Sequence, residues 1–203
     1  MSIVQGEKHE AILDAAYSLF GSKGFYETKM SDIAEIAGIA KGTIYLYFKS
    51  KEELFTAVTR RDCGQFLDSM RAALKIVGFE ERLQVLADRH LRYYYERKEH
   101  TKLFFRTPNN DPDLMEFMHQ FFREYTKLVQ DVLEEGGIAE PGLHAESFIG
   151  MMDRHKMDIM MNPSFNEQEL EKRSYFVASL FLHGCMAAEE SGRPVLVNRS
   201  QQQ

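Results

Sequence analysis

The sequence predicts an all-α fold of about nine helices, in which a compact three-helix head at the N-terminus precedes a larger helical body. Apolar residues recur at helical spacing along most of the chain, beginning with Ile12, Ala15, Ala16 and Leu19. The strict alternation of apolar and polar residues that marks a strand is nearly absent. Clusters of Gly, Pro and Asn separate the periodic segments, as loops between helices do.

Three short helices are expected within the first 50 residues. The first carries the apolar stripe that includes Ile12, and it is expected to stop at Gly21 and Gly24. A second, very short unit ends before Gly38, where a tight turn needs a residue that tolerates positive φ. The third covers about residues 42–48.

Longer helices are expected after the head. The first of them, of about 25 residues, should begin at Ser50, whose hydroxyl can cap the helix amides, with Glu53 as the reciprocal capping partner. Gly78 breaks its pattern, and the polar tail 196–203 is expected to fray. Further helices are expected at about 80–98, 101–107, 113–135, 143–161 and 167–190.

Composition limits the classes of protein to consider. The chain has 203 residues, two cysteines and a net charge of −6. No apolar run approaches the roughly 18–20 residues needed to cross a bilayer, and Glu7, Glu10 and Asp14 stand where a signal peptide is basic and then apolar. Two cysteines make no disulfide framework, so we expect a cytoplasmic protein without membrane contact. A chain this acidic has no global electrostatic reason to approach nucleic acid.

The motifs of common catalytic sites are missing from the sequence. It contains no Gly-x-Ser-x-Gly elbow, Gly-rich phosphate loop, His-Glu-x-x-His or Cys-x-x-Cys. The histidines are scattered, and the nearest approach to metal-ligand spacing on one helix is Asp153 with His155. We therefore expect no enzyme, metal site or cofactor. Cys63 is either a redox trigger or, as the simpler interpretation, a buried thiol.

The most specific pattern lies in residues 31–48. A short helix, a glycine turn and a second short helix, packed through small alanines, have helix-turn-helix geometry. The second helix directs Lys41, Thr43, Tyr45 and Tyr47 outward. In a DNA major groove Lys and Tyr reach phosphates, and Thr reaches a base edge or a thymine methyl. The alternative is a three-helix subdomain whose tyrosines merely pack on a neighbour.

This pattern resembles the tetracycline-repressor (TetR) family of bacterial transcriptional regulators. The family signature joins an acidic-Ile-Ala group, Ala-Gly, Lys-Gly-Thr-Ile-Tyr-x-Tyr-Phe and Ser-Lys-Glu-Glu-Leu, and the chain carries all four from Asp32 to Leu54. The resemblance covers about residues 6–66. It implies a DNA-binding head at 1–50 with its motif at about 29–48, a helical ligand-binding and dimerisation domain at 51–195, and a tail at 196–203.

The resemblance also implies which residues contact DNA. The recognition helix begins at Lys41 and touches bases or the adjacent backbone, while Lys51 binds phosphate beside the next helix. Where the family has a capping Ser or Thr before the first helix of the motif, this chain has Lys29, which cannot accept a hydrogen bond from the helix amides. Either Thr28 or Ser31 caps instead, which leaves open which of them meets phosphate. The implied DNA-binding residues are Thr28, Ser31, Lys41, Gly42, Thr43, Tyr45, Leu46, Tyr47 and Lys51.

The resemblance implies that two copies pair through the last two long helices, about 143–161 and 167–190. The second of these presents Tyr175, Phe176 and Leu180 on one face with small residues, a stripe that taken alone suits an ordinary core better than an interface.

Aromatic and methionine side chains are concentrated in the body. Neighbours such as Tyr93 and Tyr94 cannot all face one core, because adjacent residues of a helix lie about 100° apart. Two interpretations remain: an apolar cavity for a lipophilic or aromatic effector, or simple core packing. The candidate effector-binding residues are Tyr93, Tyr94, Phe104, Phe105, Phe121, Phe122, Tyr125, Met151, Met152 and His155.

Together these features predict a homodimeric transcriptional regulator, a repressor released from a pseudo-palindromic double-stranded DNA operator by an unknown small-molecule effector. The net charge of −6 does not exclude DNA, because residues 41–51 carry three lysines and no acid. Two alternatives stay open. One is a DNA-binding regulator whose body binds a protein partner, and the other is a ligand-binding helical protein with a non-functional head.

Overall fold

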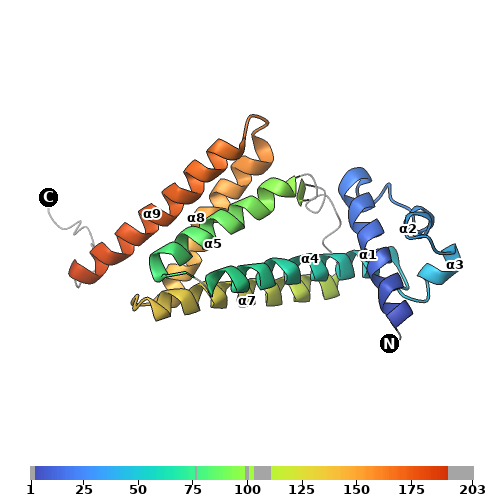
Figure 1. Ribbon diagram of the computed structural model, residues 1–203, viewed down its shortest axis with the longest axis horizontal. Helices are drawn as coiled ribbons and strands as arrows, with labels where there is room; N and C mark the ends of the chain where they lie inside the picture. Colours follow the sequence, from blue (N-terminus) through green and yellow to red (C-terminus); the bar gives the residue numbers. More distant parts are fainter. Residues whose placement is uncertain (1–2, 76, 99–100, 103–110, 192–203) are drawn as a thin grey trace, which may run out of the picture. The chain divides into compact units, whose positions relative to one another are not determined.

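The computed structural model describes residues 3–75, 77–98, 101–102 and 111–191, with side chains from residue 5 to residue 184 within those ranges. All regular structure in these ranges is helical, which confirms the all-α prediction (Figure 1). Eight helices are found there, against about nine expected. Most of the expected helix 101–107 and the whole tail 196–203 lie outside the described residues. The helices are α1 (Ile3–Lys23), α2 (Met30–Ile36), α3 (Lys41–Ile44), α4 (Lys51–Leu74), α5 (Phe79–Glu96), α7 (Pro112–Glu135), α8 (Pro141–Met161) and α9 (Glu167–Ser191).

The chain forms two compact units. Unit 1 comprises Met1–Ser69 and Tyr93–Arg123, and unit 2 comprises Met70–Arg92 and Glu124–Gln203. Unit 1 therefore contains the whole expected head together with parts of α4, α5 and α7. The expected division after residue 50 stays a prediction.

Unit 1 is built around one apolar core. Helices α1, α2 and α3 lie together in Figure 1, and their buried faces meet residues of α4 and α7. The rings of Phe20, Phe25 and Phe55 contact one another in pairs, with centroids 5.3–5.7 Å apart. Leu54 of α4 is fully buried in the same core. The head core thus extends past residue 50 into the first turns of α4.

The end of α1 and the start of α4 show which local sequence signals set the helix boundaries. Helix α1 continues through Gly21 to Lys23, so the expected stop at Gly21 is wrong and the helix ends at Gly24, whose φ is 90°. Glycine inside a helix costs only about 1 kcal/mol, which buried neighbours outweigh. At the start of α4 the Glu53 amide donates to Ser50 Oγ (3.0 Å), as expected for a cap. The Glu53 carboxylate accepts from the Lys49 amide (2.6 Å) rather than from Ser50.

Helix α3 is shorter than the expected 42–48 and ends at Ile44. The chain continues in tight turns, because the amides of Leu46 and Tyr47 donate to the carbonyls of Thr43 and Ile44, three residues back. The Phe48 amide reaches the Ile44 carbonyl at 3.0 Å, which keeps Phe48 on the buried side of this segment.

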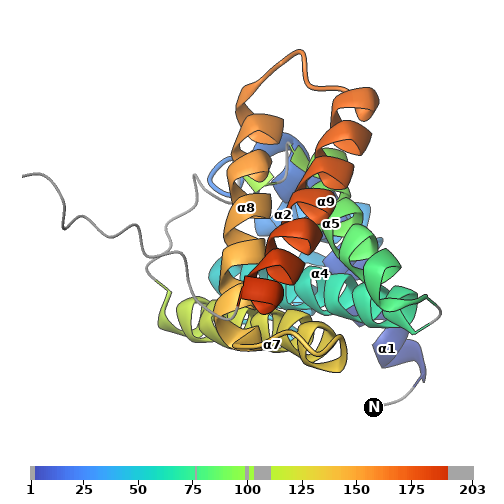
Figure 2. The same ribbon diagram turned by 90° about the vertical axis from the view of Figure 1, so that its left-hand side faces the viewer.

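Unit 2 contains the first part of α5, the second part of α7, and the α8–α9 pair. Helices α8 and α9 pack against each other as an antiparallel hairpin, seen in Figures 1 and 2. Phe148 of α8 is fully buried, and its ring lies 4.6 Å from that of Phe181 on α9. Asn166 caps α9 by accepting from the Glu169 amide (3.0 Å).

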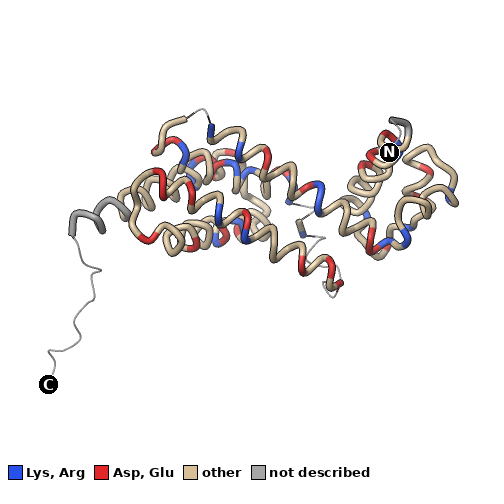
Figure 3. Tube along the Cα trace, turned by 90° about the horizontal axis from the view of Figure 1, so that it is seen from below, with Lys and Arg blue, Asp and Glu red and all other residues tan. Residues whose placement is uncertain are grey.

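Charged residues of both signs alternate along the helices of each unit (Figure 3). Neither unit therefore presents a surface of one sign along its whole length. Among the described helices, none combines the length and the apolar character that a membrane span requires.

The turn between α2 and α3 predicts a contrast in stability between two glycines. Gly38 has φ of +67°, whereas Gly42 lies in α3, and an added Cβ meets no atom within 4 Å at either position. Gly38→Ala should lower the free energy of unfolding by about 1–2 kcal/mol because an L side chain is strained there. Gly42→Ala should leave it unchanged or raise it by up to about 1 kcal/mol. Urea unfolding followed by circular dichroism measures both, and equal effects would contradict this account.

Candidate nucleic-acid interface

Helices α2 and α3 form a helix-turn-helix unit on the core of unit 1. Ile33 and Ala34 on α2 and Ile44 on α3 are buried, so these faces fix the two helices on the core. The Ile39 amide donates to the Ala34 carbonyl (2.9 Å) across the turn, and Gly38 supplies the positive φ that the turn needs. The glycine turn expected from the sequence is therefore present.

The opposite side of α3 and the turn that follows it is open to solvent. Lys41 and Gly42 are exposed, Tyr45 is 47% exposed and Leu46 is 84% exposed. An apolar side chain this exposed is unusual on a free surface and suits contact with a thymine methyl. Thr43 is half-buried beside these residues. The structure thus brings the expected recognition residues onto one segment.

Tyr47 is half-buried because it packs on a residue that sequence reasoning missed. The His9 ring of α1 lies 6.4 Å from the Tyr47 ring and 5.2 Å from the Phe48 ring, measured between centroids. His9 therefore supports the end of the recognition segment from α1. No local pattern in the sequence marks this contact, since the partners lie almost 40 residues apart.

The two residues expected to cap α2 or meet phosphate have other partners. No side chain caps α2. Thr28 is buried, and its hydroxyl donates to the Gly24 carbonyl (2.7 Å), so that hydroxyl is not available to phosphate. The half-buried Ser31 hydroxyl donates to Asp32 Oδ1 (3.2 Å). Of the pair, Ser31 remains the one with a side chain at the surface.

Lys51 has different partners from the phosphate that the resemblance implies. Its ammonium donates to the backbone carbonyls of Phe25 (2.8 Å), Thr28 (3.0 Å) and Tyr26 (3.4 Å), and it lies 4.4 Å from the centre of the Phe25 ring. An ammonium has three hydrogens, and three carbonyls accept them here. The side chain joins the start of α4 to the α1–α2 loop, so its role in this structure is internal.

The candidate effector residues fall into two separate groups. Tyr93, Tyr94, Phe121 and Phe122 belong to unit 1, whereas Tyr125, Met151, Met152 and His155 belong to unit 2. Phe104 and Phe105 lie outside the described residues.

In unit 1 the aromatic candidates form a chain of ring contacts. Phe66 lies 4.7 Å from Tyr93 and 6.2 Å from Phe121, and Phe121 lies 5.5 Å from the half-exposed Phe122. The Tyr93 hydroxyl donates to the Asp62 carboxylate. Burial, followed by the charge of Asp62, raises the pKa of Tyr93. Tyr93 is thus a hydrogen-bonded tyrosine packed against Phe66.

In unit 2, Tyr125 and Met152 are buried, and the Tyr125 hydroxyl lies 2.9 Å from His90 Nδ1. His90 Nε2 lies 3.4 Å from Asp153, which Lys156 also contacts at 2.5 Å. Burial lowers the pKa of His90 although Asp153 opposes the shift. These side chains link α5, α7 and α8 through polar contacts inside the unit.

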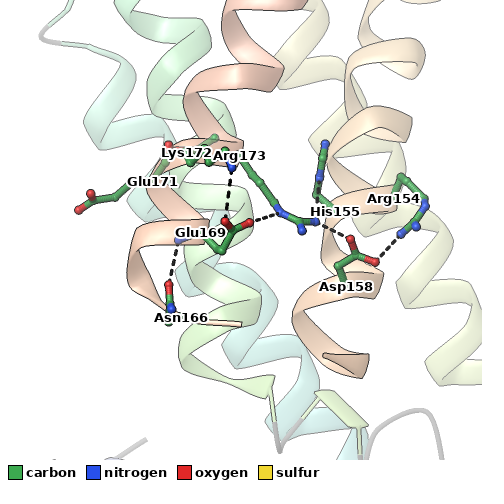
Figure 4. Close-up of polar contacts among 9 residues, drawn as sticks. Arg154, His155, Asp158, Asn166, Glu169, Glu171, Lys172 and Arg173 are labelled. Carbon is green, nitrogen blue, oxygen red and sulfur yellow. Dashed lines mark hydrogen bonds and ion pairs between the residues drawn. The ribbon is translucent and has the colours of Figure 1, made fainter. Parts of the chain in front are cut away.

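His155 lies in a polar network that joins α8 and α9 (Figure 4). Arg173 of α9 binds Asp158 and Glu169, and its guanidinium is 3.4 Å from His155 Nδ1. Arg173 and Arg154 lower the pKa of Asp158 to about 2. These contacts tie the hairpin together at its loop end, while Met151 is half-buried on the same helix.

The Cys63 thiol has a structural explanation. Cys63 is buried, and burial followed by the charge of Asp62 raises its pKa to about 12. A thiol with so high a pKa is a poor redox trigger, which favours the buried-thiol interpretation. Across the described ranges, no group of three or more His, Cys, Asp or Glu could hold a metal ion.

Comparison with known proteins agrees with this geometry. A model of the family described as "Bacterial regulatory proteins, tetR family" matches residues 12–58. The chain is 30% identical over 135 residues to the fatty acid metabolism regulator protein of Bacillus subtilis, which covers 64% of this chain and 68% of that protein. It is 44% identical over 80 residues to the regulator RutR of Escherichia coli. That match covers 39% of this chain and 35% of RutR. The structure of the regulator FadR from Bacillus subtilis with stearoyl-CoA is similar with a TM-score of 0.71 at 25% identity, over 86% of this chain and 98% of FadR.

The contrast between Lys41 and Lys51 gives a test of the interface. Lys41→Gln should weaken binding to duplex DNA and lower the slope of log affinity against log salt concentration by about 1, because one phosphate contact is lost. Lys51→Met keeps the apolar stem on Phe25 but removes the donor to three carbonyls. It should lower the free energy of unfolding by about 1–2 kcal/mol and leave the salt slope unchanged.

Fluorescence anisotropy at several salt concentrations and urea unfolding measure these quantities. A lower salt slope for Lys51→Met would show that its ammonium binds phosphate after all.

Proposed function

Since the chain belongs to the TetR family of bacterial regulatory proteins and is a DNA-binding transcriptional regulator, we propose that it is a cytoplasmic, homodimeric repressor relieved by a long-chain acyl thioester. Two heads place their α3 segments in successive major grooves of a pseudo-palindromic operator, about one helical turn apart. The proposal contains no catalytic step, in keeping with relatives that are transcriptional regulators.

The observation that carries the DNA-binding part is the exposed α3 segment on a fully packed core. Lys41 and Tyr45 reach phosphates, while Thr43 and Leu46 face base edges. Gly42, exposed and without a side chain, lets the backbone approach the DNA closely. The remaining proposed contacts, at the edge of the segment, are Ser31 and Tyr47.

An exposed apolar face on α8 and α9 supports the homodimer. On α9, Tyr175 is 68% exposed, Phe176 54% and Leu180 52%. On α8, Leu143 and Met161 are 60% and 73% exposed. The α9 residues share one side of the helix, and large apolar side chains gathered in this way mark an interaction surface. A two-fold pairing of the α8–α9 hairpins covers the same patch on both copies.

The acyl thioester is proposed from two relatives. One is named a fatty acid metabolism regulator, and the solved FadR holds stearoyl-CoA. The methionine side chains of unit 2, such as Met151 and Met152, suit a flexible apolar chain. The effector favours a conformation whose two heads no longer match the groove spacing, and DNA affinity falls by the difference in fit.

The DNA and effector steps can be tested with one labelled duplex. The protein should select a pseudo-palindromic duplex from a randomised library, and stearoyl-CoA should weaken binding by about tenfold or more, within the usual range of allosteric coupling. Free coenzyme A is the control and should have no effect. Failure to select any duplex would contradict DNA binding, whereas selection without release by acyl-CoA esters of 8–18 carbons would contradict only the effector class.

The proposed dimer surface predicts that a charge placed in it lowers the mass of the particle in solution from that of a dimer to that of a monomer. Leu180→Arg places a charge in the centre of the proposed contact and should convert the dimer into a folded monomer, because an unpaired buried charge opposes association. Phe122→Arg on α7, where the side chain is 50% exposed, is the matched control and should stay dimeric. Sedimentation equilibrium reads the mass against the 23.6 kDa of one chain. If the Leu180→Arg protein remains a dimer, the interface does not include Leu180 and the proposed pairing is contradicted.

A further inference from the structure

One carboxylate in unit 1 joins three helices. Asp62 of α4 accepts a hydrogen bond from the hydroxyl of Tyr93, in the last turn of α5. It also lies 3.4 Å from Nε of Arg97, the residue that follows α5. Burial and then the charge of Asp62 raise the pKa of Tyr17 on α1, while the neighbouring Arg97 guanidinium opposes the shift. The network therefore connects α1, α4 and the end of α5 through polar side chains.

The position of Asp62 makes this network costly to disturb. Its side chain is only 20% exposed, and the Arg97 Nε atom is buried without a hydrogen bond of good geometry, so the charge of Asp62 is what balances it. The guanidinium also stacks 4.8 Å from the centre of the Tyr93 ring. Burial alone would lower the pKa of Arg97, but Asp62, Tyr17 and Tyr93 outweigh it and raise the pKa. Removing either charge leaves the other poorly solvated.

A neighbouring contact offers a natural comparison. Arg61, the residue before Asp62, also ties α4 to α1 by binding Glu10 (3.1 Å) and Asp14 (2.8 Å). Those two carboxylates are 60% and 75% exposed, and exposed ion pairs contribute little, about 0–1 kcal/mol. The two α1–α4 contacts therefore differ in burial while joining the same helices.

We infer that Asp62 and Arg97 are positioning residues for DNA binding, which hold α1 on α4 and thereby place the helix-turn-helix unit that α1 supports. The inference rests on the proposed DNA-binding function. By this inference Asp62, Arg97, Tyr17 and Tyr93 affect DNA binding without contacting the DNA themselves. It also connects the end of α5 to the head, because Tyr93 and Arg97 contact Asp62 of α4 and lie near Tyr17 of α1.

The test compares four variants of the full chain. Asp62→Asn and Arg97→Met remove one charge each, the second keeping an unbranched apolar chain over Tyr93. Arg61→Gln removes the exposed contact between the same helices. Arg92→Gln removes another ion-paired arginine of α5, one that binds Asp88 and Glu167 in unit 2.

Binding to a duplex selected by the wild-type protein is measured by anisotropy at several salt concentrations, together with hydrogen exchange of the α1 amides in the free protein. Asp62→Asn and Arg97→Met should bind about tenfold more weakly, with an unchanged salt slope and faster exchange in α1. Arg61→Gln and Arg92→Gln should stay within about twofold of the wild type. If the two network variants also stay within twofold, or if Arg61→Gln weakens binding as much as they do, the inference is overturned.

A milder variant keeps the test decisive if a charge-removing variant does not fold. Tyr93→Phe deletes only the hydroxyl that binds Asp62, and it should weaken DNA binding about threefold with faster α1 exchange. Wild-type affinity and exchange for Tyr93→Phe in that case would overturn the inference. The exchange measurement needs no DNA, so it tests the effect of the network on α1 even if the wild type selects no duplex. That failure would count against the proposed function only.

Discussion

The apolar contact between the first turns of α4 and helices α1–α3 is the constraint on which the rest of the molecule depends. About 50 residues bury too little surface to be stable alone, and Leu54, Phe55 and Val58 of α4 supply the missing core. The Lys51 ammonium adds a polar connection at the same place by binding the carbonyls of the α1–α2 loop. The exposed segment at α3 is therefore positioned by α4, because both pack on the same core.

Much of the fold could be predicted because its signals are local. Helical spacing located α5, α7, α8 and α9 to within a few residues, and the Ser50 cap located the start of α4. The exposure of Lys41 and Tyr45 could be predicted as well, since Ile44 and Phe48 are buried on the other side of the segment. Thr43 and Tyr47, which the sequence also predicts to face outward, are half-buried. The end of α1 was mispredicted at Gly21 because the packing of Leu19 and Phe20 outweighs a small propensity cost.

Partner choice could not be predicted, because it depends on residues that only the fold brings together. Lys51 resembles a phosphate-binding lysine in sequence, yet its carbonyl partners lie 23–26 residues earlier. Tyr93 reads as one of three adjacent tyrosines, and nothing nearby indicates that it binds Asp62, 31 residues away. His155 shows the same limit, since its neighbour Arg173 comes from the next helix. The residue types predicted that these side chains make polar contacts, but which groups they contact depends on the tertiary structure.

The charges of the head bear on how an acidic chain binds DNA. The first 60 residues hold seven basic and eight acidic side chains. Two of the basic ones have partners within unit 1, Lys23 with Asp32 and Lys51 with backbone carbonyls. Arg61, the next residue along the chain, binds Glu10 and Asp14. The head therefore carries no excess of positive charge, and its overall electrostatic attraction to DNA is weak. In the proposed homodimer two heads share one operator, and the binding of the first head raises the effective concentration of the second. In that proposed arrangement a small change in the spacing of the two heads weakens DNA binding, because no large electrostatic attraction compensates for the lost fit.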